Sequence, residues 1–231
     1  MGTSRSFRSP GTPRWRSIIG HIANDDPHEL IRAELFNAGV LDGWNEEFAR
    51  PGIKVYVDAL VGAHGDLSEA LREAARPQDA IEQLVSETRN EALRTDAAPT
   101  LAIAERALTR TLLGTVREGA PLGASEPNVA SEAWERQRGT PASLVSRFLG
   151  EVLHQFTCHV IARDAGQIVG RGAYEGARSV RLLERDLARN AQQVASAIDV
   201  SGSAAELSGR WSTLVDEAFR RAAAPPAGSD G

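Results

Sequence analysis

The sequence predicts an all-α fold, an irregular bundle of helices with disordered N- and C-terminal tails. Apolar residues recur at three- and four-residue intervals through most of the chain, which is the spacing of one buried helix face. Only residues 53–57 have the density of β-branched side chains typical of a strand, and residues 58–61, which continue them, fit a helix equally well. Because one strand cannot form a sheet, we expect helices to build the core.

Four helix starts are predicted from residues that can bond the free N–H groups of a first turn. Each start combines an N-cap side chain with proline at the first helical position or with an acid three residues later. The four are Asp26 with Pro27 and Glu29, Asp66 with Glu69, Thr140 with Pro141, and Ser203 with Glu206. We expect the first of these helices to end near Asn37.

Apolar stripes identify the helix faces that should be buried. Their members are spaced so that they fall on one side of a helix. The stripes are Ile81, Leu84, Val85 and Thr88; Leu101, Ala104, Leu108 and Leu112; Val145, Leu149, Val152, Phe156 and Val160; Leu183, Leu187, Val194 and Ile198; and Leu207, Trp211, Leu214, Ala218 and Phe219. We expect these residues to form the core.

Glycine and proline divide the chain into segments. We predict a flexible basic N-terminal arm over residues 1–25, an N-terminal helical half over residues 26–115, a loop or linker over residues 116–128, a C-terminal long-helix half over residues 129–221 and a disordered tail over residues 222–231. The stretch from Gly166 to Gly176 is expected to be a hinge between two long helices.

Composition limits the classes of function. The chain has 231 residues, 42% of them hydrophobic, and a net charge of −5, so its surface as a whole does not favour nucleic acid. Cys158 is the only cysteine, which excludes an internal disulfide and indicates a reducing compartment, the cytoplasm. We expect neither a membrane span nor a secretory signal. Arginine in place of lysine, with many alanines, indicates a high-GC bacterial genome.

Candidate metal sites are few, and each has a structural alternative. His154, Cys158 and His159 fall on one predicted helix, where His154 and Cys158 share a face as zinc or copper ligands would. No further ligand is evident, and a cysteine between apolar neighbours is usually a core residue. The histidines and aspartates of residues 21–28 include a predicted cap. We therefore predict no metal site and no cofactor.

The glycine-rich stretch is the remaining candidate site. It could cradle phosphate, but it lacks the ending of a P-loop and does not follow a predicted strand. Arg163, Arg171 and Arg178 beside it form a candidate surface for binding an anion or docking a partner. Because no hydrolase or metalloprotease motif is present, we expect that the protein is not an enzyme.

The N-terminus is the most unusual part of the chain. Its first 20 residues contain four arginines and no acidic residue. Removal of Met1, which a small second residue permits, would expose the α-amine of Gly2. Such an amine has a pKa of about 7.7 to 8.0, so a useful fraction is neutral and nucleophilic at cellular pH. Gly2 and Ser6 also match a myristoylation pattern, which a bacterial origin argues against, and a tail without chemistry is the simplest alternative.

Two patches carry a resemblance to a known family. They are Met1-Gly2-Thr3-Ser4-x-Ser6-Phe7 and Phe156-Thr-Cys-His-Val-Ile-Ala-Arg163-Asp164, which leads into Val169-Gly170-x-Gly172. Both resemble the B subunit of Qat-type bacterial anti-phage defence systems. The resemblance implies a non-catalytic subunit that works beside an ATPase, a QueC-like enzyme and a TatD-like nuclease. It also implies that the QueC-like enzyme joins a 7-deazaguanine-type base to the α-amine of Gly2.

The residues after Gly2 would then form a partner-binding arm. Small side chains leave entry into an enzyme pocket unobstructed, and arginines can meet acidic groups or phosphate at its mouth. The arm comprises Thr3, Ser4, Arg5, Ser6, Phe7, Arg8, Arg14, Trp15 and Arg16.

A different class of function fits the same arm. An aromatic residue between two arginines, as at Trp15, can stack on and neutralise an exposed strand, so a helical nucleic-acid adaptor is the alternative. Salt separates the two hypotheses, because nucleic-acid binding weakens steeply as salt rises and a covalent adduct does not. The oligomeric state stays open, since apolar stripes can pack within one chain or between chains.

Overall fold

The computed structural model describes residues 13–37, 44–120, 126–170 and 174–225, apart from the side chains of residues 13–15, 164 and 167. Within these ranges the chain forms eleven α-helices and no β-strand, which confirms the all-α prediction. The helices are α1 (Pro13–Ala23), α2 (His28–Asn37), α3 (Trp44–Phe48), α4 (Pro51–Glu73), α5 (Pro77–Thr95), α6 (Leu101–Gly119), α7 (Pro127–Gln137), α8 (Pro141–Ile168), α9 (Ala177–Ser196), α10 (Ala204–Gly209) and α11 (Trp211–Ala223).

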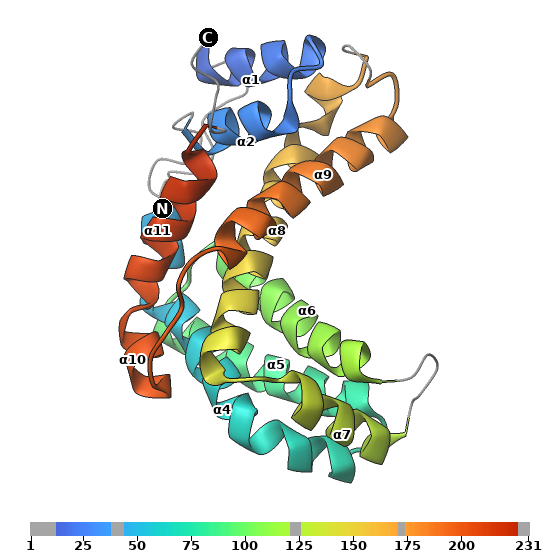
Figure 1. The fold of residues 1–231 in the computed structure, drawn as a ribbon, viewed down its shortest axis with the longest axis vertical. Coiled ribbons are helices and arrows are strands. Elements are labelled where there is room, and N and C mark those ends of the chain that lie inside the picture. The colour runs from blue at the N-terminus through green and yellow to red at the C-terminus, as the bar shows by residue number, and fades with distance from the viewer. Residues whose placement is uncertain (1–12, 38–43, 121–125, 171–173, 226–231) are drawn as a thin grey trace.

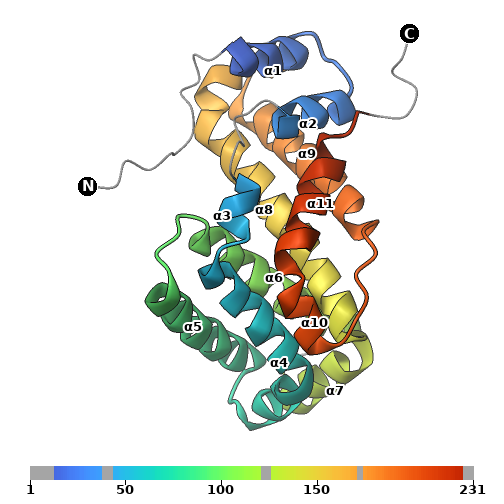
Figure 2. The same cartoon turned by 90° about the vertical axis from the view of Figure 1, so that its left-hand side faces the viewer.

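Helix α8 runs through the middle of the molecule (Figure 1). It contacts α9, α6, α4, α11, α10 and α1. Helices α4 to α7 gather around its N-terminal half, and α1, α2 and α9 lie around its C-terminal half (Figures 1 and 2). The helix can occupy this place because it is apolar on more than one face. Its predicted stripe is fully buried, and so are the apolar residues between the stripe members, Leu144, Phe148, Leu153 and Ile161.

Aromatic rings from four helices join the two ends of the chain. The centroids of neighbouring rings are 5.0 to 6.2 Å apart in this cluster, which consists of Phe36, Trp44, Phe48, Phe156 and Phe219. These separations are typical of favourable aromatic pairs. The buried residues of both predicted halves belong to one hydrophobic cluster, so the two halves pack as a single core.

Most predicted stripe residues are buried, and two of the predicted helix starts are confirmed. Among the stripe residues, only Leu84 and Val194 are half-buried. Thr140 forms a capping box with Ser143 at the start of α8, in which the Thr140 N–H donates to Ser143 Oγ at 2.9 Å. The second capping box precedes α10, where the Ser203 N–H donates to Oε2 of Glu206 at 2.7 Å. Both signals act over three residues, which is why the sequence alone reveals them.

Helix α4 corrects two predictions. Residues 53–57 are helical, and Ile53, Tyr56 and Val57 are fully buried at helical spacing. Packing of this face against the core outweighs the strand preference of its β-branched residues. Asp66 was predicted as a helix start but lies inside α4, which continues unbroken past it.

Helix α2 is shifted slightly from its prediction. It begins at His28, so Pro27 precedes the first helical residue. Oδ2 of Asp26 lies 2.7 Å from Nδ1 of His21, and this contact spans the turn between α1 and α2.

Several predicted segment boundaries are wrong. Helix α1 occupies much of the predicted flexible arm of residues 1–25, because its isoleucines are buried. The predicted linker of residues 116–128 overlaps α6 and α7, which leaves residues 120–126 between those helices. Gly166 lies inside α8 rather than in a hinge, and α11 extends into the predicted tail of residues 222–231. None of the described helices has both the length and the apolar character needed to cross a bilayer.

Candidate functional site

The predicted N-terminal site falls partly on helix α1. Gly2, Thr3, Ser4, Arg5, Ser6, Phe7 and Arg8 lie outside the described residues. Arg14, Trp15 and Arg16 belong to the first turn of α1, where Arg16 is exposed. These three positions were predicted to be part of a flexible arm, and the helix corrects that prediction.

Helix α1 is fixed to the body by its apolar face. Ile18 and Ile22 are fully buried and Ile19 is 7% exposed. The helix packs against α2 and α8. These isoleucines therefore hold α1 against the body of the protein. They are spaced as on one face of a helix, so the sequence contains a signal for α1. The arginines around them favoured the interpretation of this segment as a flexible arm.

The predicted arginine surface is only partly visible. Arg163 is exposed near the end of α8, and Arg178 is exposed in the first turn of α9. Arg171 lies outside the described residues. Because only residues 169–176 separate the end of α8 from the start of α9, and the two helices pack against each other, the two described arginines lie at the same end of the helix pair.

The predicted ligands on α8, His154, Cys158 and His159, are all half-buried. Nδ1 of His154 lies 3.6 Å from Oε2 of Glu151. Burial, together with the nearby carboxylate of Glu184, raises the pKa of Cys158 to about 12. A thiol with this pKa is protonated at neutral pH and is a weak nucleophile and metal ligand. Among the residues that the structure describes, no three His, Cys, Asp or Glu side chains gather as a metal site.

A polar pocket of about 400 Å³ lies between α6, α8 and α9. Within it, Nε2 of Gln192 donates to Oε1 of Glu151 at 2.9 Å. Burial acts to raise the pKa of Glu151, but His154, Gln155 and Arg110 together outweigh it, so the pKa lies below its usual value. Glu151 is therefore a carboxylate at neutral pH, and it serves to hold α9 against α8.

The charged groups at the mouth of this pocket also bind one another. Arg147 donates to Oε2 of Glu118 at 2.9 Å and to Oγ1 of Thr115 at 3.3 Å. Gly150 allows the close packing of α8 on α9, because a Cβ there would lie 3.1 Å from Cγ of Gln192. These contacts account for Arg147, Glu118 and Gln192 without a ligand.

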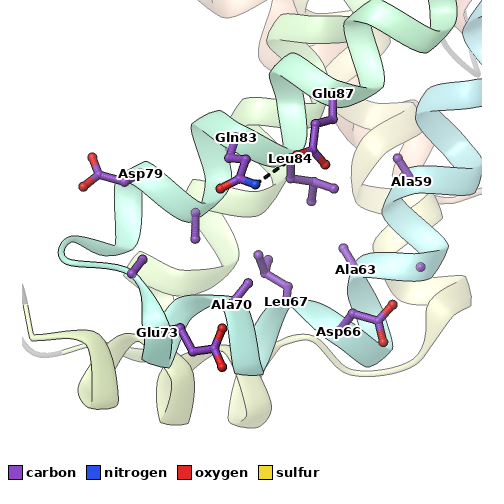
Figure 3. Close-up of a pocket in the computed structure, with 13 residues that line it drawn as sticks. Ala59, Ala63, Asp66, Leu67, Ala70, Glu73, Asp79, Gln83, Leu84 and Glu87 are labelled. Atoms are coloured by element: carbon purple, nitrogen blue, oxygen red, sulfur yellow. Dashed lines mark hydrogen bonds between the residues drawn. The ribbon is translucent and has the colours of Figure 1, made fainter.

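A groove of about 550 Å³ lies between α4 and α5 (Figure 3). The two helices are joined by the short turn at residues 74–76. Leu67 and Leu84 project from the two helices into the space between them. The rest of the floor is made of residues with a short side chain or none, which leave this space unfilled: Ala59, Gly62, Ala63, Ala70, Ala74 and Ala80.

The rim of the groove is acidic. It carries Asp66 and Glu73 from α4 and Asp79 and Glu87 from α5, and no lysine, arginine or histidine lines the groove. Arg76 donates to Asp79 at 2.7 Å from outside the groove, and Gln83 donates to Glu87 at 2.9 Å. Asp66 and Glu73 have no ion-pair partner within the described part of the chain. The groove therefore joins an apolar floor to a negative edge.

Sequence reasoning missed this groove. Its carboxylates have the appearance of a solvated helix face, and Asp66 was interpreted as a cap. The available signal was a row of residues three or four positions apart, in which alanine surrounds one leucine: Ala59, Ala63, Leu67, Ala70 and Ala74. A helix face made of such small residues can lie close to another helix, but its side chains fill little of the space between the two helices.

Comparisons with protein-family models, with curated proteins and with solved structures found no match for this chain.

Proposed function

We propose that this chain is a non-catalytic helical subunit of a bacterial anti-phage defence complex in the cytoplasm. In this proposal the α-amine of Gly2 accepts a 7-deazaguanine-type base from a QueC-like partner enzyme. An ATPase and a TatD-like nuclease are the further partners. The proposal extends the resemblance carried by the two short sequence patches.

The anchoring of α1 is the observation that supports this proposal most directly. Ile18 and Ile22 are fully buried, so the chain is fixed to the body shortly after the predicted acceptor. The segment from Gly2 to Pro13 spans at most about 40 Å when it is fully extended. An enzyme docked on the nearby end of the body is therefore within reach of the glycine amine.

The modification reaction requires only a neutral, accessible α-amine from the acceptor chain. The neutral α-amine attacks the carbonyl carbon of an activated acyl group carried by the base, and its proton passes to a base of the partner enzyme. The bond between that carbon and its activating group breaks, and the activating group leaves with the electron pair. Glycine has no side chain to obstruct entry into a narrow pocket. A lysine would be a poorer acceptor, because its pKa of about 10.4 leaves it almost fully protonated at cellular pH.

Helix α1 bears on the nucleic-acid alternative. Successive positions of a helix are rotated by about 100°, so positions 14, 15 and 16 fall on different sides of the α1 axis. An arm that stacks and neutralises one strand needs these side chains on the same side. This geometry favours the acceptor proposal over the adaptor.

Intact mass and N-terminal peptide sequencing of the protein from its native host, with its genomic neighbours present, test the proposal. We expect an adduct on Gly2 that survives denaturation and is lost in a Gly2→Pro variant. A Thr3→Ala variant serves as the control, since it keeps the acceptor amine. An unmodified Gly2 under these conditions would overturn the proposal. A fatty acyl mass would do the same, and salt-sensitive binding of single-stranded DNA by an unmodified chain would support the alternative.

A further inference from the structure

The groove between α4 and α5 has no part in the proposed function. We propose that it binds a basic amphipathic helix of a partner protein. The helix would place apolar side chains on the alanine and leucine floor and arginine or lysine side chains against the acidic rim. This inference does not depend on Gly2, because no groove residue belongs to the N-terminal segment.

The shape of the groove suits a helix. Two helices that diverge from a tight turn form a trough, and a third helix can lay a row of side chains along it. The half-buried Leu84 offers apolar contact at the centre, above the buried Leu67, and the small residues around them let a backbone approach closely. Gly62 is open to the groove, because a Cβ built there meets no atom within 4 Å.

The charge of the groove selects among partners. Asp66 and Glu73 on α4 face no basic partner within the described residues, and Asp79 and Glu87 extend the negative edge along α5. An acidic or neutral helix would leave these carboxylates next to an apolar contact without compensation. A helix with arginine or lysine flanking its apolar face would compensate them and would be attracted from a distance.

A labelled peptide tests this proposal on the full-length chain. The probe is a fluorescein-labelled amphipathic peptide of about 18 residues, about five helical turns, with leucine and alanine on one face and arginine on the other. Fluorescence anisotropy measures its affinity. A scrambled peptide of the same composition keeps the charge and loses the apolar face. We expect the scrambled peptide to bind at least about tenfold more weakly.

The variant Gly62→Leu blocks the floor without disturbing the fold. The leucine side chain has space inside the groove, and leucine is a better helix former than glycine. We expect it to weaken peptide binding by at least about tenfold. The matched control is Gly166→Leu, another helical glycine with open space at its Cβ, which lies in α8 away from the groove. Equal binding by the two variants would overturn the proposal.

A second pair of variants tests the rim. Asp66→Asn with Glu73→Gln removes the two carboxylates that lack basic partners, and we expect weaker binding with a shallower dependence on salt. The control is the double variant Glu69→Gln with Glu82→Gln. It also removes two negative charges, but from exposed positions of α4 and α5 that do not line the groove. Equal loss in both double variants would show that only overall charge matters and would overturn the proposal.

The competing occupant is a second copy of this chain. Light scattering of the purified protein at several concentrations detects it. A monomer supports a partner helix as the occupant. A dimer that Gly62→Leu converts to a monomer would assign the groove to self-association and overturn the proposed occupant.

Discussion

The indole Nε1 of Trp211 donates a hydrogen bond of 2.8 Å to the backbone carbonyl oxygen of Phe48. The bond is buried and joins α11, near the C-terminus, to the short helix α3. Trp211 is 1% exposed, and Phe48 is fully buried within the aromatic cluster. This contact ties the two ends of the chain together at the core.

Trp211→Phe should therefore destabilise the whole fold. It leaves the Phe48 carbonyl without this donor, which costs about 1 to 3 kcal/mol, and the lost ring volume adds to that cost. Urea denaturation measures the free energy of unfolding. Leu182→Ala is the control, because Leu182 is 52% exposed and should change the free energy by less than about 0.5 kcal/mol. Similar values for both variants would contradict the assigned role.

The hydroxyl oxygens of Ser68 and Ser131 lie 2.8 Å apart and link α4 to α7. Both residues are buried, so Ser68→Ala or Ser131→Ala alone leaves a buried hydroxyl without this bond, at a cost of about 1 to 3 kcal/mol. The double alanine variant removes both polar groups together. We expect it to cost less than the sum of the single variants in a double-mutant cycle. Additive costs would show that the two hydroxyls are energetically independent.

Some of this structure could be predicted from the sequence, and some could not. The caps at Thr140 and Ser203 depend on residues three positions apart, so the sequence contains the whole signal. The helical state of residues 53–57 depends instead on packing against the core, which overrides local preference. The groove depends on how α4 and α5 meet, and neither helix encodes that angle alone. Helix α1 was not predicted because its arginines suggested a flexible arm, although Ile18 and Ile22 have helical spacing.

Arg50 and Asp96 should make stability depend on pH. Hydrogen bonds from Arg50 hold the pKa of Asp96 below its usual value. The contribution is therefore present above the unfolded-state pKa of about 3.9 and is lost as the pH falls through the lower folded-state value. Asp96→Asn should cost about 1 kcal/mol at pH 7, because Arg50 is partly screened by solvent, and less at pH 3.

Urea denaturation at both pH values measures this difference. The control is Glu91→Gln, which removes an exposed carboxylate 3.5 Å from Arg94 and should have little effect at either pH. An equal cost of Asp96→Asn at pH 7 and pH 3 would show that the ion pair does not contribute.

Cys158 should react slowly in the folded protein. Its pKa of about 12, raised first by burial, leaves very little thiolate at pH 7. Titration with a disulfide reagent such as DTNB should be slow in buffer and rapid in guanidinium chloride, where the ordinary thiol pKa of about 8.5 is restored. Rapid reaction of the folded chain would contradict the burial of this side chain.

Gly62 should lower the stability of α4. Glycine inside a helix costs about 0.5 to 1 kcal/mol relative to alanine, and a Cβ at this position meets no atom within 4 Å. Gly62→Ala should therefore raise the free energy of unfolding by about that amount. Gly119→Ala is the contrasting variant, because its Cβ would lie 2.6 Å from the carbonyl oxygen of Ala133 and should destabilise the protein. If Gly62→Ala is more stable and also binds the amphipathic peptide more weakly, then the glycine serves the groove at the expense of the helix. A less stable Gly62→Ala variant would show instead that the glycine serves the fold.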